Sequence, residues 1–264
     1  MKLIEDNKFF GSKVIYDFAK ETGDITIFTG KVFASFFKKP FEHKEFLKHA
    51  YYYGYNTFML IAITNFIMGL VLTLQSRPVL VEFGAEAWLP GMVSISIIRE
   101  IGPVITALIC AGKIGSGIGA ELGSMKVTEQ IDAMEVSGTN PIKYVVASRV
   151  LATTIMIPIL VVFADFIGLL GSYVAIIIRS KISLMVFFRD ALDVLELIDI
   201  IPATIKSIIF GFFIGLIGCY KGYTTGQGTE AVGRSANSAV VTASLTIFII
   251  DLVVVQIIDL MNFL

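Results

Sequence analysis

The sequence is poor in charged residues. Only 16% of its 264 residues are charged, whereas 55% are hydrophobic, and the mean hydropathy is +0.80. A chain this apolar is not a soluble domain and belongs with proteins that cross a membrane several times. The net charge of -1, with no clustered basic stripe, gives no sign of a nucleic-acid partner.

Cysteine and histidine are also scarce. Cys110 and Cys219 lie inside apolar runs, so they suit neither a secreted disulfide framework nor a metal site, and we expect both in the core. His43 and His49 have no cysteine or acidic cluster beside them that would complete a metal site. The sequence has no Walker A loop, and it lacks the HExxH and GxSxG patterns of hydrolases. It therefore predicts no catalytic residue, no metal and no cofactor in this chain.

Long apolar runs are what the sequence does contain. Eighteen residues of helix rise about 27 Å, close to the ~30 Å hydrocarbon core of a bilayer. We therefore expect an all-α integral membrane protein with five transmembrane helices. The runs cover 57–74, 89–112, 147–178, 202–220 and 240–262.

Lysine and arginine are unequally divided between the two sides of these runs. Fifteen lie in the N-terminal segment and in the two connections on its side, against four in the connections on the other side. The positive-inside rule places the N-terminus in the cytoplasm. An odd number of spans then places the C-terminus on the other side.

Residues 1–50 differ from the spans and form a separate N-terminal segment in front of a membrane domain of residues 51–264. Apolar residues follow helical spacing there while lysines fall elsewhere, which fits an amphipathic helix lying in the membrane interface. A helix packed against the protein's own spans would show the same pattern. The apolar positions are Phe9, Phe10, Val14, Phe18, Ile25, Phe28, Val32 and Phe36.

Small residues recur every fourth position in the second run, at Gly115, Gly119 and Gly123. They form a smooth ridge on which another helix can approach closely, so the spacing predicts tight helix packing. Gly211 and Gly215 form a second such ridge in the fourth run.

A short helix should follow the first ridge. Thr128 is placed to cap its start, and Gly138 to end it in a left-handed conformation. Such a helix is either a docking surface for a partner protein or a simple loop closure, and the pattern leaves both open. Its apolar edge is Val127, Ile131 and Met134, and its acidic positions are Glu129, Asp132 and Glu135.

Five charged residues fall inside the apolar runs, where each would cost about 2.5–3.5 kcal/mol if it faced lipid. We expect them to face protein or water. Adjacent residues point about 100° apart on a helix, so the first two should find partners on different helices. The buried carboxylates also allow an alternative function, an ion-coupled secondary transporter. The five are Arg99, Glu100, Asp165, Lys206 and Asp251.

The run from Arg99 to Pro141, REIGPVITALICAGKIGSGIGAELGSMKVTEQIDAMEVSGTNP, closely resembles the signature of the MlaE family. These permeases are membrane subunits of ABC transporters that move lipids. The resemblance continues through SRVLA at 148–152, TIKSIIFG at 204–211 and GYTTGQGTEAVGRSAN at 222–237.

The resemblance implies a permease homodimer without its own motor in the inner membrane of a bacterial cell. Cytoplasmic ATPase subunits would use ATP on its behalf, commonly together with a STAS-domain protein. An MCE-domain protein would bind on the periplasmic side, where the C-terminus lies. The expected function is the movement of phospholipid between membranes.

The resemblance also implies roles for particular residues. Arg99, Glu100 and Lys206 match charged positions near the family's lipid cavity. The segment from Glu129 to Val136 resembles the helix that couples the permease to its ATPase. Contacts with the ATPase are expected of Glu129, Gln130, Ile131, Asp132, Met134 and Glu135. We further expect lipid-tail contacts from Leu70, Val71 and Leu74, and a dimer interface near Gly115, Gly119 and Gly123.

Overall fold

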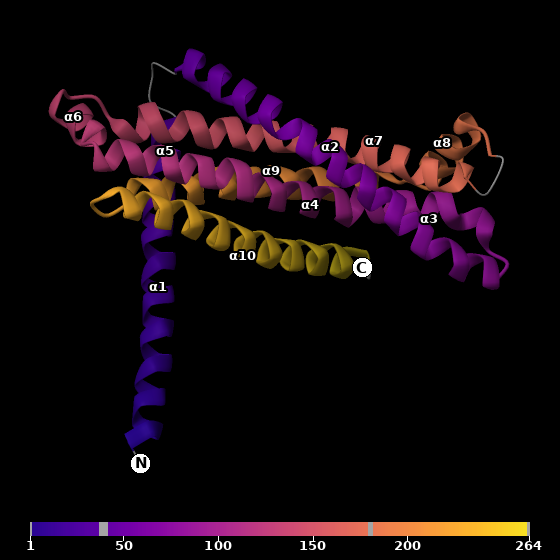
Figure 1. Cartoon of the computed structure of the whole chain (residues 1–264), viewed down its shortest axis with the longest axis horizontal. Helices are drawn as coiled ribbons and strands as arrows, with labels where there is room; N and C mark the ends of the chain where they lie inside the picture. The colour runs from indigo at the N-terminus through magenta and orange to yellow at the C-terminus, as the bar shows by residue number, and fades with distance from the viewer. Residues whose placement is uncertain (1, 37–41, 179–181, 263–264) are drawn as a thin grey trace.

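The computed structural model describes residues 2–36, 42–178 and 182–262, and these are helical with short connections (Figure 1). No strand occurs within those ranges. The α-helices are α1 Lys2–Phe36, α2 His43–Glu82, α3 Leu89–Ser96, α4 Gly102–Cys110, α5 Ser116–Val127, α6 Gln130–Val136, α7 Ser148–Ile177, α8 Leu184–Asp193, α9 Leu197–Tyr223 and α10 Thr229–Asn262. One turn is a 3₁₀-helix, η1 Glu86–Trp88. The π-helical turns are η2 Ile97–Ile101, η3 Ala111–Gly115 and η4 Ile142–Ala147.

Among the described residues, five helical stretches are long and apolar enough to cross a membrane, which confirms the predicted all-α membrane fold. The second stretch runs without a break through α3, α4 and α5. Each stretch begins before its predicted run, because hydropathy marks only the part suited to lipid. The five are His43–Glu82, Glu86–Val127, Ile142–Ile177, Leu197–Tyr223 and Thr229–Leu260.

Close backbone contacts hold the bundle together. α2 packs along α7, and α7 packs against α9. A methyl group added at Gly69 would lie 1.9 Å from the Gly168 carbonyl oxygen, and one at Gly171 would lie 2.1 Å from that of Phe66. Only glycine permits these contacts between α2 and α7, since lipid offers no hydrophobic drive and helices associate through such packing.

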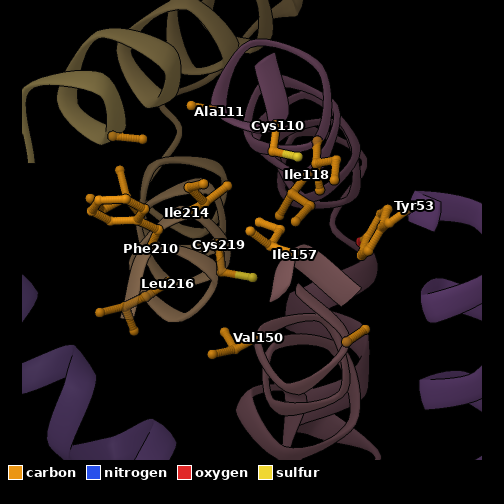
Figure 2. Close-up of a cluster of buried hydrophobic side chains, with 14 of the residues drawn as sticks. Tyr53, Cys110, Ala111, Ile118, Val150, Ile157, Phe210, Ile214, Leu216 and Cys219 are labelled. Carbon is orange, nitrogen blue, oxygen red and sulfur yellow. The ribbon is translucent and has the colours of Figure 1, made fainter. Parts of the chain in front are cut away.

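The main hydrophobic core lies where α4, α5, α7 and α9 meet (Figure 2). Cys110 and Cys219 are both fully buried in it and unbonded to each other, as the sequence predicts. A second, smaller cluster joins α3 to α8 through Leu89, Val93 and Phe187 at the end of the bundle away from α6 (Figure 1).

Three π-helical turns interrupt the second and third spans. η2 contains Arg99 and Glu100, η3 contains Lys113, and η4 starts the third span. In a π turn each backbone hydrogen bond spans five residues instead of the four of an α-helix, so the helix is locally wider. Such turns are often found at functional sites. The hydropathy pattern gives no sign of these turns.

α1 crosses the bundle at its α6 end and projects away from it (Figure 1). Its last turns decide between the two predicted environments, because Phe28 and Val32 are buried and the Phe28 ring contacts those of Tyr220 and Tyr223. This part of α1 therefore packs against the protein's own spans. The side chains of Phe9, Phe10, Val14 and Phe18 lie outside the described residues.

Candidate functional site

A cavity of about 190 Å³ lies where η2, the first turns of α9 and the last turns of α10 meet. We call it the charged cavity. Arg99 and Glu100 line it from η2, Asp199 and Lys206 from α9, and Val255 from α10. Lys206 and Tyr223 are 17 positions apart on one helix, so the cavity lies about 26 Å from the α6 end of α9.

Lys206 is the centre of an ion-pair network. Its side chain is 1% exposed, and its Nζ lies 2.7 Å from Glu100 Oε2 and 2.7 Å from Asp251 Oδ1. Three spans, through η2, α9 and α10, each supply one member. A buried cation needs such partners, because an unpaired charge would be expelled or neutralised.

Arg99 forms a second ion pair at the cavity edge. Its Nε lies 3.3 Å from Asp199 Oδ1, and the other carboxylate oxygen, Oδ2, accepts the backbone N–H of Glu196 at 3.0 Å. Asp199 thereby caps the start of α9 while it holds Arg99. The sequence analysis missed Asp199, because it lies three residues before the apolar run that begins at Pro202.

The expectation that Arg99 and Glu100 find partners on different helices is wrong. Asp199 and Lys206 both belong to α9. They are seven residues apart, about 10 Å along the helix, and the long side chains of Arg99 and Glu100 diverge to reach them. The π turn at η2 also changes the direction of adjacent side chains from that of a regular α-helix.

Asp165 lies apart from this network. Its Oδ1 is buried without a hydrogen-bond partner in the described part of the chain and sits where a side chain on Gly102 would begin. Asp165 and Asp251 therefore occupy separate environments, one against the backbone after η2 and the other against Lys206.

The predicted lipid-tail residues do not reach the charged cavity. Leu70 is half-buried on α2, whereas Val71 and Leu74 are 36% and 43% exposed. None of the three lines the cavity, which is bounded by η2, α9 and α10. They face outward because α2 packs along α7, on another side of the bundle.

The glycine ridge of α5 packs helices of the same chain. A methyl group at Gly119 would lie 3.3 Å from Ala236 Cα in α10, and one at Gly123 would lie 3.0 Å from Ser235 Oγ. Gly115 faces Ile214 of α9. The predicted tight packing at this ridge is confirmed, and its partners are α9 and α10 of the same chain. A dimer interface among the spans near the ridge stays a prediction.

α6 stands at the opposite end of the bundle from the charged cavity (Figure 1). Ile131 is fully buried and Met134 packs against the main core, so these two support the helix from inside. Asp132 pairs with Lys126 at 2.5 Å. The exposed residues of this predicted coupling segment are Glu129, Gln130 and Glu135, and Val136 beside them is 90% exposed.

The ends of α6 differ in part from the prediction. Thr128 does not cap it, because the Thr128 hydroxyl donates back to the Ser124 carbonyl oxygen at 2.8 Å and so belongs to the end of α5. Glu129 precedes α6 with a φ of 59°, a left-handed conformation. Gly138 has a φ of 78° and ends the helix as predicted.

Tyr223 adds a contact between α6 and the fourth span. Its hydroxyl donates to Glu135 Oε1 at 2.8 Å, and Tyr223 is the last residue of α9. One helix therefore contacts α6 at its end and carries Asp199 and Lys206 at its start. This geometry connects a surface outside the apolar spans to a charged cavity within them.

The family model described as Permease MlaE matches residues 46–257. The chain belongs to the MlaE permease family. A probable ABC transporter permease of Rickettsia typhi is 38% identical over 90% of this chain and 92% of its own length. A probable ABC transporter permease of Synechocystis is 36% identical over 84% of each chain. As an MlaE permease, this chain is a membrane subunit of an ABC transporter, and the ion-coupled alternative loses its support.

A plant protein is also similar to this MlaE permease. The chloroplastic protein TRIGALACTOSYLDIACYLGLYCEROL 1 of Arabidopsis thaliana is 32% identical over 87% of this chain and 65% of its own length. The match with the Rickettsia protein covers nearly all of both sequences, so the five-span unit is the part that these relatives share.

Proposed function

We propose that this chain is the lipid-conducting subunit of a homodimeric transporter in a bacterial inner membrane, and that it moves phospholipid between membranes. A separate ATPase drives it from the cytoplasm, on the α6 side, and an MCE-domain protein receives or delivers lipid on the periplasmic side. A STAS-domain protein is a further cytoplasmic partner. The Arabidopsis relative, whose name is that of a galactolipid, supports lipid as the class of substrate.

The charged cavity is the observation that carries this proposal. It presents both signs of charge, and the side chains of Arg99 and Glu100 are 40% and 44% exposed. A phospholipid headgroup offers a phosphate to Arg99, and in zwitterionic lipids an ammonium to Glu100. The apolar face of α10 around Val255 then leaves a path for acyl chains beside the headgroup.

A second copy of the chain explains how these exposed charges are tolerated. Each would cost about 2.5–3.5 kcal/mol if it faced the hydrocarbon of the bilayer. The cavity opens beside α10, whose side chains Leu245, Phe248 and Leu252 are all more than half exposed. A copy packed against α10 would enclose the cavity between two permeases and keep Arg99 and Glu100 from lipid tails.

Transfer of a fluorescent phospholipid between donor and acceptor vesicles tests the proposal, with the permease reconstituted alongside its ATPase and MCE partners. Arg99→Gln and Glu100→Gln should each slow transfer by about tenfold or more, since each removes a charged hydrogen bond to the headgroup. Arg189→Gln is the matched control, because Arg189 is 77% exposed and pairs with Asp193 on α8, outside the cavity.

Assembly of the same variants is measured by size-exclusion chromatography. Both cavity variants should form the complete complex, because Glu100→Gln leaves Asp251 on Lys206 and Arg99→Gln leaves Asp199 its capping role. Normal lipid transfer by both variants, or loss of the assembled complex, would assign these charges to helix packing and overturn the proposed role.

A further inference from the structure

A second and larger cavity lies at the α6 end of the bundle. It has a volume of about 360 Å³ and is enclosed by the first turns of α2, by η3 and by α5. We call it the α2–α5 cavity. Its walls include Lys48, His49 and Tyr53 from α2 and Lys113 and Glu121 from the second span. It shares no lining residue with the charged cavity.

Two buried polar side chains on the wall of this cavity form no hydrogen bond with the described residues. His49 is 6% exposed and Tyr53 is 4% exposed. His49 Nε2 and Tyr53 Oη are buried and form no hydrogen bond with any described residue. Each such group costs about 1–3 kcal/mol when left unsatisfied, so both favour a ligand that accepts hydrogen bonds.

The rings of His49 and Tyr53 are held in place on the cavity wall. They stack with their centroids 5.6 Å apart and their planes 22° apart. The Tyr53 ring reaches from α2 to the edge of the main hydrophobic core (Figure 2). Because the ring is packed there, the position of Tyr53 on the cavity wall is fixed.

The charge around the cavity favours an anion. Lys48 and Lys113 line it, and Arg149 lies behind it, 5% exposed, with its Nη2 2.7 Å from Glu121 Oε1. Glu45 is the second acidic group, 3.6 Å from Lys48 and 3.7 Å from His49. Lys48, Lys113 and Arg149 carry three positive charges against the two negative charges of Glu45 and Glu121, which leaves an excess of one positive charge. Lys113 also donates to the Asn56 carbonyl oxygen, which fixes it across the opening.

Exposed tyrosines give the depth of the cavity in the membrane. Tyr51, Tyr52 and Tyr55 are 70%, 61% and 70% exposed on the same turns of α2. Tyrosine collects at the level of lipid headgroups, where its ring is apolar and its hydroxyl is hydrated. The exposed side chains that follow, Phe58 and Met59, are apolar and lie alongside acyl chains. An anion at this level is supplied by the lipids themselves.

We propose that the α2–α5 cavity binds the phosphate of a phospholipid headgroup from the leaflet on the α6 side. Lys48 and Lys113 supply the charge, and Tyr53 Oη and His49 donate hydrogen bonds to the phosphate oxygens. The acyl chains lie outside, along Phe58 and Met59. This proposal requires only that the permease lies in a membrane. It can be right or wrong independently of the proposal that lipid is transported through the charged cavity.

Gly117 provides a way to close this cavity. It lines the wall, and a side chain added there meets nothing within 4 Å, so Gly117→Leu fills the cavity without moving the backbone. A side chain added at Gly112 would also meet nothing within 4 Å, but Gly112 does not line the cavity. Gly112→Leu is therefore the matched control. Tyr53→Phe removes one oxygen atom and leaves the packed ring in place.

The probe is a phosphatidylglycerol that carries a photoreactive group on its headgroup, added to the full-length permease in dodecyl maltoside. After illumination, labelled peptides are identified by mass spectrometry. Labels are expected in 48–57 and 113–121. Gly117→Leu should lower this labelling by about tenfold, because its side chain fills the cavity. Tyr53→Phe should also lower it by about tenfold, as expected for the loss of one hydrogen bond to a charged group. Gly112→Leu should label like the parent, and labelling at 198–206 should be unchanged in all three variants.

Competitors identify the chemistry that the cavity recognises. Unlabelled phosphatidylglycerol should prevent labelling of 48–57, whereas diacylglycerol and millimolar inorganic phosphate should not. Protection by diacylglycerol would show that the cavity takes an acyl chain, and protection by free phosphate would show a soluble-anion site. Either outcome overturns the proposal, as would unchanged labelling in both Gly117→Leu and Tyr53→Phe.

Discussion

Replacement of Lys206 by methionine tests whether the charged cavity is a tightly coupled network. Lys206 Nζ lies 2.7 Å from each of its two carboxylate partners. The oxygens of Glu100 and Asp251 are therefore no more than about 5.4 Å apart, where two like charges repel by about 3 kcal/mol at an effective dielectric constant of about 20. Lys206→Met removes the cation between them and should lower the free energy of unfolding by about 3–5 kcal/mol, the range for breaking a buried ion pair.

Rescue variants separate charge repulsion from lost packing. Methionine is close to lysine in length and fills the same space, so the loss should come mainly from the two unpaired carboxylates. The triple variant Lys206→Met, Glu100→Gln, Asp251→Asn removes that repulsion and should regain most of the lost stability, because apolar replacement of a whole buried ion cluster is often neutral. Thermal unfolding in detergent, followed by the fluorescence of Trp88 and by size-exclusion chromatography, measures each variant at pH 7.

The reasoning is refuted if Lys206→Met unfolds like the parent. It is also refuted if the triple variant is no more stable than the single one, since the loss would then be one of packing.

Two further predictions concern the surfaces proposed for partners. Glu129→Lys reverses an exposed charge before α6 and should weaken co-purification of the ATPase. Glu230→Lys, a change in the first turn of α10 at a side chain that is 82% exposed, should not weaken it. Equal ATPase yield with both variants would show that α6 is not part of the interface. Leu252→Cys on the exposed face of α10 should form a disulfide between two copies under mild oxidation, seen as a dimer on denaturing gels. Val162→Cys, on α7 at a side chain that is 65% exposed, should stay monomeric on the same gels. The reverse pattern would place the dimer interface elsewhere.

Sequence reasoning predicted the spans well because their signal is strong. Runs such as 57–74 and 240–262 are long and apolar, so length and hydropathy alone identify them. The charged cavity was also partly predictable, since Arg99, Glu100 and Lys206 are too costly to leave in lipid and must meet something polar. Which residues they meet depends on how the helices are rotated, and that information is not local.

The wrong or incomplete predictions share this dependence on neighbours. A GxxxG ridge indicates close packing but not the partner, and Gly119 meets α10 of its own chain because α10 returns beside α5. Thr128 has the right residue type for a cap, but it ends α5, and the left-handed Glu129 takes the cap position of α6. α6 therefore begins at Gln130, one residue later than a Thr128 cap would place it. The π turn at Arg99 and Glu100 leaves no trace in composition.

α9 is the part of the permease that could carry movement between the α6 surface and the charged cavity, and its packing limits what kind of movement that is. Methyl groups at Gly211 and Gly215 would lie 2.6 Å from the Thr153 carbonyl oxygen and 2.1 Å from the Thr153 Oγ1 of α7, and one at Gly222 would lie 2.6 Å from Leu122 of α5. At these positions the α9 backbone lies against α7 and α5 with no side chain of its own between them, so little can give way locally when α9 is displaced. A displacement of Tyr223 by α6 must therefore move α9 as a rigid body against α7 and α5, and Lys206 with it, which alters its distances to Glu100 and Asp251 on two other spans.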